Sequence, residues 1–144
     1  MAELKRDTPV DFATEVVPFL RKNCFACHNE KKAKADLNLE SPQAMLTGGD
    51  SGPALVPGKP MESLVFLYAA HLEEEIMPPA KNKSNAVNLN PDELALLKLW
   101  IEQGAKYEKH WAFIAPRKSN VPKVADTGNP IDAFLQQRLA KEGL

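Results

Sequence analysis

Both cysteines of this 144-residue chain lie in one short stretch, NCFACH, at residues 23–28. Cys24 and Cys27 are separated by two residues, and His28 follows the second cysteine directly. A Cys-x-x-Cys pair commonly serves as a redox disulfide, as half of a zinc site, or as the attachment point of a c-type haem. The choice among these three decides what the rest of the chain folds around.

The histidine after the second cysteine favours haem attachment. A redox disulfide of the thioredoxin type expects a βαβ context, and the sequence shows almost no strand pattern. A zinc site needs a second pair of ligands, and His71 and His110 have no partner at the usual spacing. In a c-type site, two thioether bonds fix the porphyrin to one backbone turn, and the next side chain directs its imidazole at the iron. We therefore predict that Cys24 and Cys27 attach one haem c covalently and that His28 is its proximal ligand; two buried thiols beside an unrelated histidine are the alternative.

The iron of an electron-transfer haem needs a sixth ligand, and a methionine thioether raises the reduction potential. The chain has four methionines, at positions 1, 45, 61 and 77. Met45 and Met61 lie beside or within apparent helices, where we expect them to fill the core. Met77 lies in a loop before the rigid pair Pro78-Pro79, which can present a thioether at little ordering cost. We predict Met77 as the distal ligand, with an apolar anchor for the loop as the alternative.

A haem of high potential also needs a largely dry pocket. Tyr68 and Trp100 are predicted to contact the haem, in packing or as donors to a propionate. His71 is expected at the surface, with bis-histidine ligation as a lesser alternative, and His110 is expected in packing or at the surface. The residues expected to line the pocket, each of which an ordinary core would also explain, are Phe25, Leu37, Leu39, Leu55, Val56, Leu64, Leu67, Tyr68, Ile76, Leu97 and Trp100.

Two helical patterns flank the motif. Residues 9–24 carry apolar side chains at i, i+4, i+7 and i+8, and Pro18 should kink this helix or delay its start. Residues 61–72 have a helical composition. The side chains expected on one apolar face of this second helix are Leu64, Leu67 and Tyr68.

The second half of the chain carries the clearest helix signal. Asn90-Pro91-Asp92-Glu93 combines a capping residue, a proline at the first helical position and acids in the first turn. This helix is expected to end at Gly104. A last amphipathic segment begins at Asn129-Pro130 and runs to the end of the sequence. The stretch TGGDSGPALVPGKP, at residues 47–60 in the first half of the chain, is dense in glycine and proline. This composition predicts an ordered loop with several turns.

Composition excludes several classes of protein. Hydrophobic residues make up 44% and charged residues 26% of the chain, as in an ordinary globular domain. The net charge of −1 gives no support to a nucleic-acid partner, and no apolar run approaches the roughly 20 residues of a membrane span. The start, MAELKRDTPV, lacks the apolar region of a signal peptide. Because c-type haem is attached outside the bacterial cytoplasm, we expect a mature or recloned form of an exported, periplasmic or extracytoplasmic protein.

The order of these features resembles class I c-type cytochromes, and more specifically the planctomycete-type cytochrome c domain. The resemblance implies an all-α, cytochrome c-like small helical domain wrapped around one haem at residues 9–107. It implies an irregular C-terminal extension at residues 108–144, which leads into a further domain of a longer protein. Carried over by position, it implies the same attachments and axial ligands as those predicted above. The stretches that carry it are VDFATEVVPFLRKNCFACHNEKKAKADLNLES, GGDSGPALVPGKPMESL, EIMPP, LNPDELALLKLWIEQGA, KHWAFIAP and NPIDAFLQQRLAKEGL.

One departure from class I cytochromes concerns the proximal ligand. Those proteins usually have a proline shortly after the motif, whose carbonyl accepts the N–H of the proximal imidazole. Here Asn29-Glu30-Lys31-Lys32 follows, and no proline comes before Pro42. Since this hydrogen bond tunes the basicity of the ligand, the identity of its acceptor stays open.

The main prediction is a monomeric, monohaem c-type cytochrome domain that transfers one electron at a time and is not itself an enzyme. Its partner would be a redox protein or a fused domain, and Lys31, Lys32 and Lys34 either steer that partner or form an ordinary solvated face. The first alternative is a sensor or peroxidase-like site with a labile Met77. The second is an interaction module formed by the extension after Tyr107.

Overall fold

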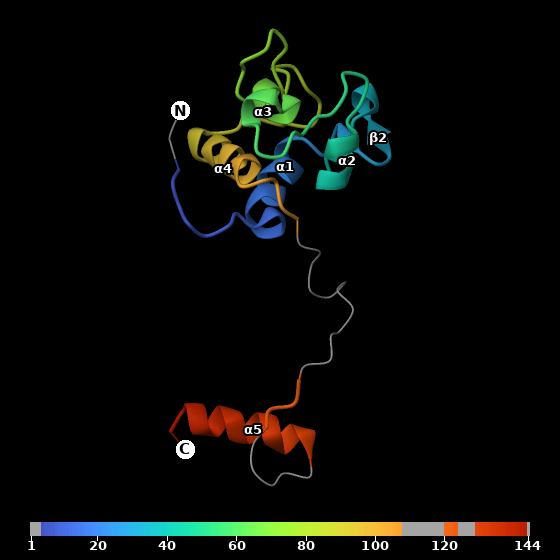
Figure 1. Ribbon diagram of the computed structural model, residues 1–144. Coiled ribbons are helices and arrows are strands. Elements are labelled where there is room, and N and C mark those ends of the chain that lie inside the picture. Colours follow the sequence, from blue (N-terminus) through green and yellow to red (C-terminus); the bar gives the residue numbers. More distant parts are fainter. Residues whose placement is uncertain (1–3, 108–119, 124–128, 144) are drawn as a thin grey trace. The chain divides into compact units, whose positions relative to one another are not determined.

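The computed structural model describes residues 4–107, 120–123 and 129–143 (Figure 1). The chain divides into two compact units between residues 111 and 112. No helix in the described ranges is both long and apolar enough to cross a membrane. The elements of the first unit are η1 (Phe12–Val16), α1 (Val17–Asn23), β1 (His28–Asn29), β2 (Lys32–Ala33), η2 (Lys34–Asp36), α2 (Pro42–Thr47), η3 (Pro60–Glu62), α3 (Leu64–Ala69) and α4 (Pro91–Glu102), and the second unit contains α5 (Pro130–Lys141).

This element order confirms a helix-rich fold, with one short pair of antiparallel strands among the described residues. In the first unit α4 packs against η1 and α3 (Figure 1). The stacked rings of Phe12 and Trp100, with centroids 4.8 Å apart, lie at the contact between η1 and α4. Trp100, Leu97 and Ile101 are almost completely buried and form the core face of α4.

The first helical segment begins as a π-helix, η1, and continues as α1. The side chain of Asp11 caps it by accepting a hydrogen bond from the backbone N–H of Thr14. The N–H of Val17 donates to the carbonyl of Phe12, five residues earlier, and the next residue, Pro18, has no N–H to donate. The prediction that Pro18 delays the start of the α-helix is therefore confirmed.

The predicted signal at the start of α4 is also confirmed. The Asn90 side chain accepts hydrogen bonds of 2.9 Å from the N–H groups of Asp92 and Glu93. The Glu93 carboxylate accepts the Asn90 N–H at 2.9 Å, which completes a capping box. The helix ends at Glu102, and Gly104 has a φ of +91°, a conformation that glycine adopts without strain.

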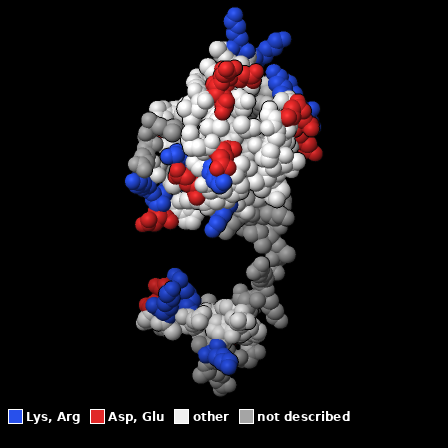
Figure 2. All heavy atoms as spheres, turned by 45° about the horizontal axis from the view of Figure 1, so that its top comes forward, with Lys and Arg blue, Asp and Glu red and all other residues white. Residues whose placement is uncertain are grey.

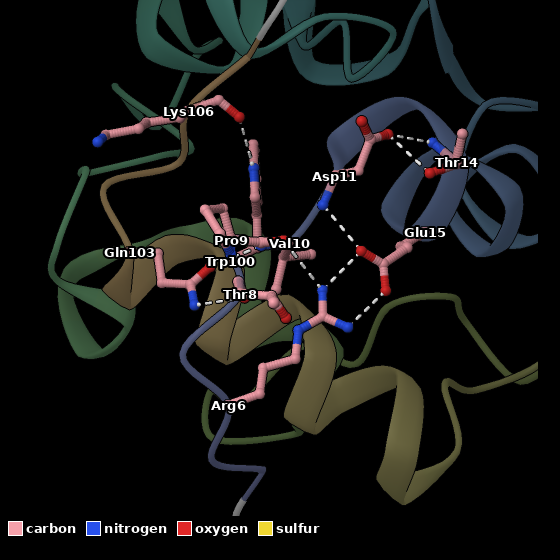
Figure 3. A network of polar contacts seen from close by, with 10 residues as sticks. All are labelled: Arg6, Thr8, Pro9, Val10, Asp11, Thr14, Glu15, Trp100, Gln103 and Lys106. Atoms are coloured by element: carbon pink, nitrogen blue, oxygen red, sulfur yellow. Dashed lines mark hydrogen bonds and ion pairs between the residues drawn. The ribbon is translucent and has the colours of Figure 1, made fainter. Parts of the chain in front are cut away.

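Polar contacts attach the segment before η1 to the end of α4 (Figure 3). Gln103 accepts the Val10 N–H through its side-chain oxygen at 2.7 Å and donates to the Thr8 carbonyl at 3.4 Å. Arg6 makes two hydrogen bonds, of 2.6 and 2.8 Å, to the Glu15 carboxylate. The Gln103 contacts supplement the stacking of the rings and join the segment before η1 to the end of α4, whereas the Arg6–Glu15 pair joins that segment to η1 itself.

The helix expected over residues 61–72 is shorter than predicted, because α3 spans only Leu64–Ala69. Its buried side chains are Val65, Phe66 and Ala69. The three side chains expected on one face of this helix, Leu64, Leu67 and Tyr68, are only partly buried.

Of the two methionines expected in the core, one is buried and the other is exposed. Met45 lies in α2 and is completely buried, which confirms the prediction. Met61 lies in η3 and is 59% exposed, so its predicted core role is wrong. The tight turn of η3 is too short to form an apolar face that would bury it.

The second unit is described here only for α5 and the residues around it. Asn129 caps α5 by accepting the N–H of Ile131 at 2.9 Å. Ile131 and Leu135 are 73% and 59% exposed. His110 lies outside the described residues.

Candidate functional site

The NCFACH motif folds as a turn directly after α1. The N–H of Cys24 donates to the Leu20 carbonyl at 2.7 Å, which extends the helical pattern by one residue. The N–H groups of Cys27 and His28 both donate to the carbonyl of Cys24 at 3.1 Å. The turn therefore holds the two cysteines and the histidine close together on one loop of backbone.

The backbone of His28 is fixed by its neighbours on both sides. His28 pairs with Ala33 in the β1–β2 ladder, and its carbonyl accepts the N–H of Leu39 at 3.1 Å. In addition, the Lys34 N–H donates to the Cys27 carbonyl at 3.1 Å. The segment 32–39 thus encloses the histidine and sets the direction of its side chain.

The imidazole of His28 is buried in a way that suits a metal ligand. Burial lowers its pKa, while the backbone carbonyls of Leu37 and Lys34 act in the opposite direction. The lowered pKa favours the neutral ring, which is the form that binds a metal. Its Nδ1 is buried and makes no hydrogen bond to any residue that the structure describes.

A large cavity lies beside this turn. Its volume is about 1110 Å³, slightly above the roughly 300–1,000 Å³ of most small-molecule sites. Apolar surface makes up most of its walls. The lining residues that could bind a cofactor are Asn23, Cys24, Cys27, His28, Tyr68 and Met77. Size, apolar character and these donors together fit a covalently attached haem.

The two cysteines are free thiols in this structure. Burial, with smaller contributions from the nearby Cys27 and Glu93, raises the pKa of the Cys24 thiol to about 12. The Cys24 thiol is therefore protonated at neutral pH, which is the state of a structural rather than a reactive cysteine.

Met77 reaches the cavity from the loop that follows α3. Its N–H donates to the carbonyl of Tyr68 at 3.3 Å, and Tyr68 also lines the cavity. The next part of the loop is organised by Asn82, whose side chain donates to the Pro79 and Ala86 carbonyls at 2.9 Å each. The same side chain accepts from the Ala86 N–H at 3.0 Å. Asn82 therefore gives a defined shape to a loop without regular secondary structure.

Asn23 connects this loop to the motif. It is the last residue of α1, lies directly before Cys24 and is only 4% exposed. Its side-chain oxygen accepts the N–H of Val87 at 3.1 Å. The sequence alone did not single out Asn23 or Asn82; the signal available for Asn23 is its position directly before Cys24.

Some of the predicted pocket residues line the cavity and others belong to the core, whereas Ile76 is 46% exposed and does neither. Leu37, Leu39, Leu64 and Tyr68 line the cavity. Trp100 instead belongs to the buried core, where its indole N–H donates to the Lys106 carbonyl at 3.0 Å. This hydrogen bond occupies the donor that was expected to reach a propionate, so the structure does not support a haem contact for Trp100. Leu55, Leu97 and other predicted lining residues are also part of the core.

Charged residues surround the cavity without forming a field of one sign. Lys32 and Lys34 line it, and Lys31 is exposed nearby in the sequence. Asp50 and Glu75 line it as well. Figure 2 shows lysine and arginine side chains scattered over the visible face among acidic ones. His71, as predicted, is exposed.

Comparison with known proteins gives one match. Residues 24–81 match the model of the family described as Planctomycete cytochrome C. Comparisons with curated proteins and with solved structures gave no significant match. The matched segment begins at Cys24 and ends just beyond Met77, so it contains Cys24, Cys27, His28 and Met77, which all line the cavity. The resemblance inferred from the sequence is thereby confirmed.

Proposed function

Since residues 24–81 are a planctomycete-type cytochrome c domain, we propose that this chain carries one covalently bound haem c and transfers single electrons. One observation carries the proposal: both thiols, His28 and Met77 line the same apolar cavity. These groups come from segments far apart in the sequence, and only the fold brings them together. A bound haem would supply an iron centre that alternates between Fe(III) and Fe(II).

Each residue has a distinct role in this proposal. Cys24 and Cys27 hold the haem through thioether bonds, so the cofactor stays in place through many electron transfers. His28, presented neutral by its buried surroundings, binds the iron on one side. Met77 binds on the other side, positioned by the hydrogen bond from its N–H to the Tyr68 carbonyl. Tyr68 packs beside the haem.

The apolar walls have two consequences for the chemistry. They keep water away from the iron, and they disfavour the additional positive charge of Fe(III). Together with a thioether ligand, this favours a high reduction potential. We also propose that the protein works in the periplasm or another compartment outside the cytoplasm. Its partner is a redox protein or a fused domain that approaches near Lys32 and Lys34, which line the cavity.

The visible spectrum of protein produced with a c-type haem attachment system tests the proposal. We expect a low-spin reduced spectrum that survives denaturation, because the haem is bound covalently, and a methionine–iron charge-transfer band in the oxidised form. Met77→Ala should abolish this band. Met61→Ala is the matched control, because Met61 is 59% exposed and lies outside the cavity lining. Absence of covalent haem in the wild-type protein would refute the proposal.

A second candidate function is a ligand-binding or peroxidase-like site with a labile Met77. This second function is favoured by the hydrogen bond from the Met77 N–H to the Tyr68 carbonyl. At 3.3 Å this bond is long, so it holds the Met77 backbone only weakly. Carbon monoxide binding to the ferrous protein distinguishes the two. Rapid and complete binding would favour the sensor, whereas firm methionine ligation resists carbon monoxide and supports the electron carrier.

A further inference from the structure

Asn23 presents an unusual combination of burial and incomplete hydrogen bonding. The side chain is 4% exposed and lines the cavity. Its oxygen accepts the Val87 N–H at 3.1 Å, whereas its amide nitrogen, Nδ2, is buried and makes no hydrogen bond within the described part of the chain. A buried polar group without a partner is costly, and most such groups in folded proteins are satisfied.

The orientation of the Asn23 amide follows from the network. Oxygen and nitrogen of an asparagine side chain are distinguished by their partners. The Val87 N–H is a donor and therefore requires the oxygen on its side. The NH₂ group is then the part of Asn23 that remains for the cavity.

We propose that the Asn23 amide donates a hydrogen bond to an acceptor that is in place only when haem is bound, so that Asn23 is a positioning residue for the haem site. This inference rests on the proposed function. Two acceptors share the required chemistry: the thioether sulfur of an iron-bound Met77 and a haem propionate. The anchor to Val87 links Asn23 to the loop that carries Met77, so the same side chain couples the motif to the distal side.

Two substitutions at this position separate its functions. Asn23→Asp keeps an oxygen for the Val87 N–H and removes the donor, whereas Asn23→Leu removes both. Asn88→Leu is the matched control, since Asn88 is exposed and belongs to the same loop. For each protein, the haem content, the methionine–iron charge-transfer band, the reduction potential as a function of pH and the rate of carbon monoxide binding are measured.

If the sulfur is the acceptor, both Asn23 variants shift the charge-transfer band and bind carbon monoxide about two- to tenfold faster than wild type, the factor that one hydrogen bond accounts for. If a propionate is the acceptor, the band is unchanged and the potential of Asn23→Leu acquires a new dependence on pH. Asn23→Asp is left out of this comparison, because its own carboxylate titrates. Variants that match Asn88→Leu in all of these readouts would overturn the inference and leave the proposed function intact. Wild-type protein without covalent haem would overturn both.

For a variant that retains no haem, the unfolding temperature of its apoprotein is compared with that of the wild-type apoprotein. If the apo variant unfolds at the temperature of the wild-type apoprotein, the defect lies in the interaction with haem and supports the inference. If the apo variant is already destabilised, Asn23 has only a structural role through Val87, and the inference is overturned.

Discussion

The contact between η1 and α4 and the cavity beside the motif satisfy their polar groups differently. At the contact, Gln103 pairs with Val10 and Thr8, and the indole N–H of Trp100 pairs with a backbone carbonyl. Arg6 leaves one buried nitrogen unpaired there, while the rest of its guanidinium binds Glu15. In the lining of the cavity, Asn23 has a buried side-chain nitrogen without a partner among the described residues.

This difference indicates which of the two regions depends on a cofactor for its stability. Apart from that Arg6 nitrogen, the polar groups of the helix contact find partners within the chain, so its stability needs no ligand. The cavity has a volume of about 1110 Å³, and both thiols and the unpaired amide of Asn23 line it. We infer that the haem serves as the missing core of this side and that its loss affects the two regions unequally.

The largest expected effect comes from removing both haem attachments, in the Cys24→Ser/Cys27→Ser double variant. The loop at residues 77–89 should lose its protection, because binding free energy no longer stabilises the closed form. We expect its amides to exchange hydrogen about 100-fold faster or more, as measured by mass spectrometry. Amides of α4 should change far less. An equal loss of protection in both regions would contradict the inference that haem stabilises the cavity side more than the helix contact. It would show that the whole unit depends on haem.

The converse substitution breaks the helix contact. Trp100→Ala removes a fully buried ring that stacks on Phe12, and such truncations cost about 3–5 kcal/mol. Denaturant unfolding should show this loss in the apo and the haem-bound form alike. Trp100→Phe is the milder control, because it keeps a ring but loses the hydrogen bond to the Lys106 carbonyl. A loss confined to the haem-bound form would place Trp100 in the haem site after all.

The features that sequence predicts well here are local. The capping box of α4 depends on residues Asn90 and Glu93, only three positions apart, and the effect of Pro18 follows from its missing N–H. The motif is local as well, since Cys24 to His28 fit within one turn. These elements could be derived because their partners are close neighbours in the chain.

The features that sequence did not predict depend on distant partners. The Asn23 side chain accepts a hydrogen bond from the N–H of Val87, 64 residues away, and no local sequence pattern predicts this pairing. Tyr68 lines the cavity as predicted, whereas Trp100, for which the same prediction was made, belongs to the core. Periodicity shows that a face is apolar, but it cannot tell a haem cavity from an ordinary core.

A smaller effect is expected from the helix cap of α4. Asn90→Ala removes two hydrogen bonds to the first turn and should lower the free energy of unfolding by about 1 kcal/mol. The helix contact carries this loss, so hydrogen exchange should rise in α4 more than in the 77–89 loop. Asn129→Ala is the control, because it removes the comparable cap of α5 in the second unit. If Asn129→Ala changes the unfolding of the first unit equally, the two units are not independent.

The smallest expected effect is a pH dependence at the helix contact. Hydrogen bonds from Arg6 and from the Asp11 backbone lower the pKa of Glu15 below its usual value. A lowered pKa means that this stabilisation is present at neutral pH and is lost as the pH falls through the folded-state pKa. Glu15→Gln should therefore lower the melting temperature slightly at pH 7, and the difference from wild type should vanish in acid. Glu62→Gln, at an exposed pair with Lys59, controls for the loss of one negative charge. A difference that persists in acid would mean that Glu15 acts through packing, since its charge is then gone.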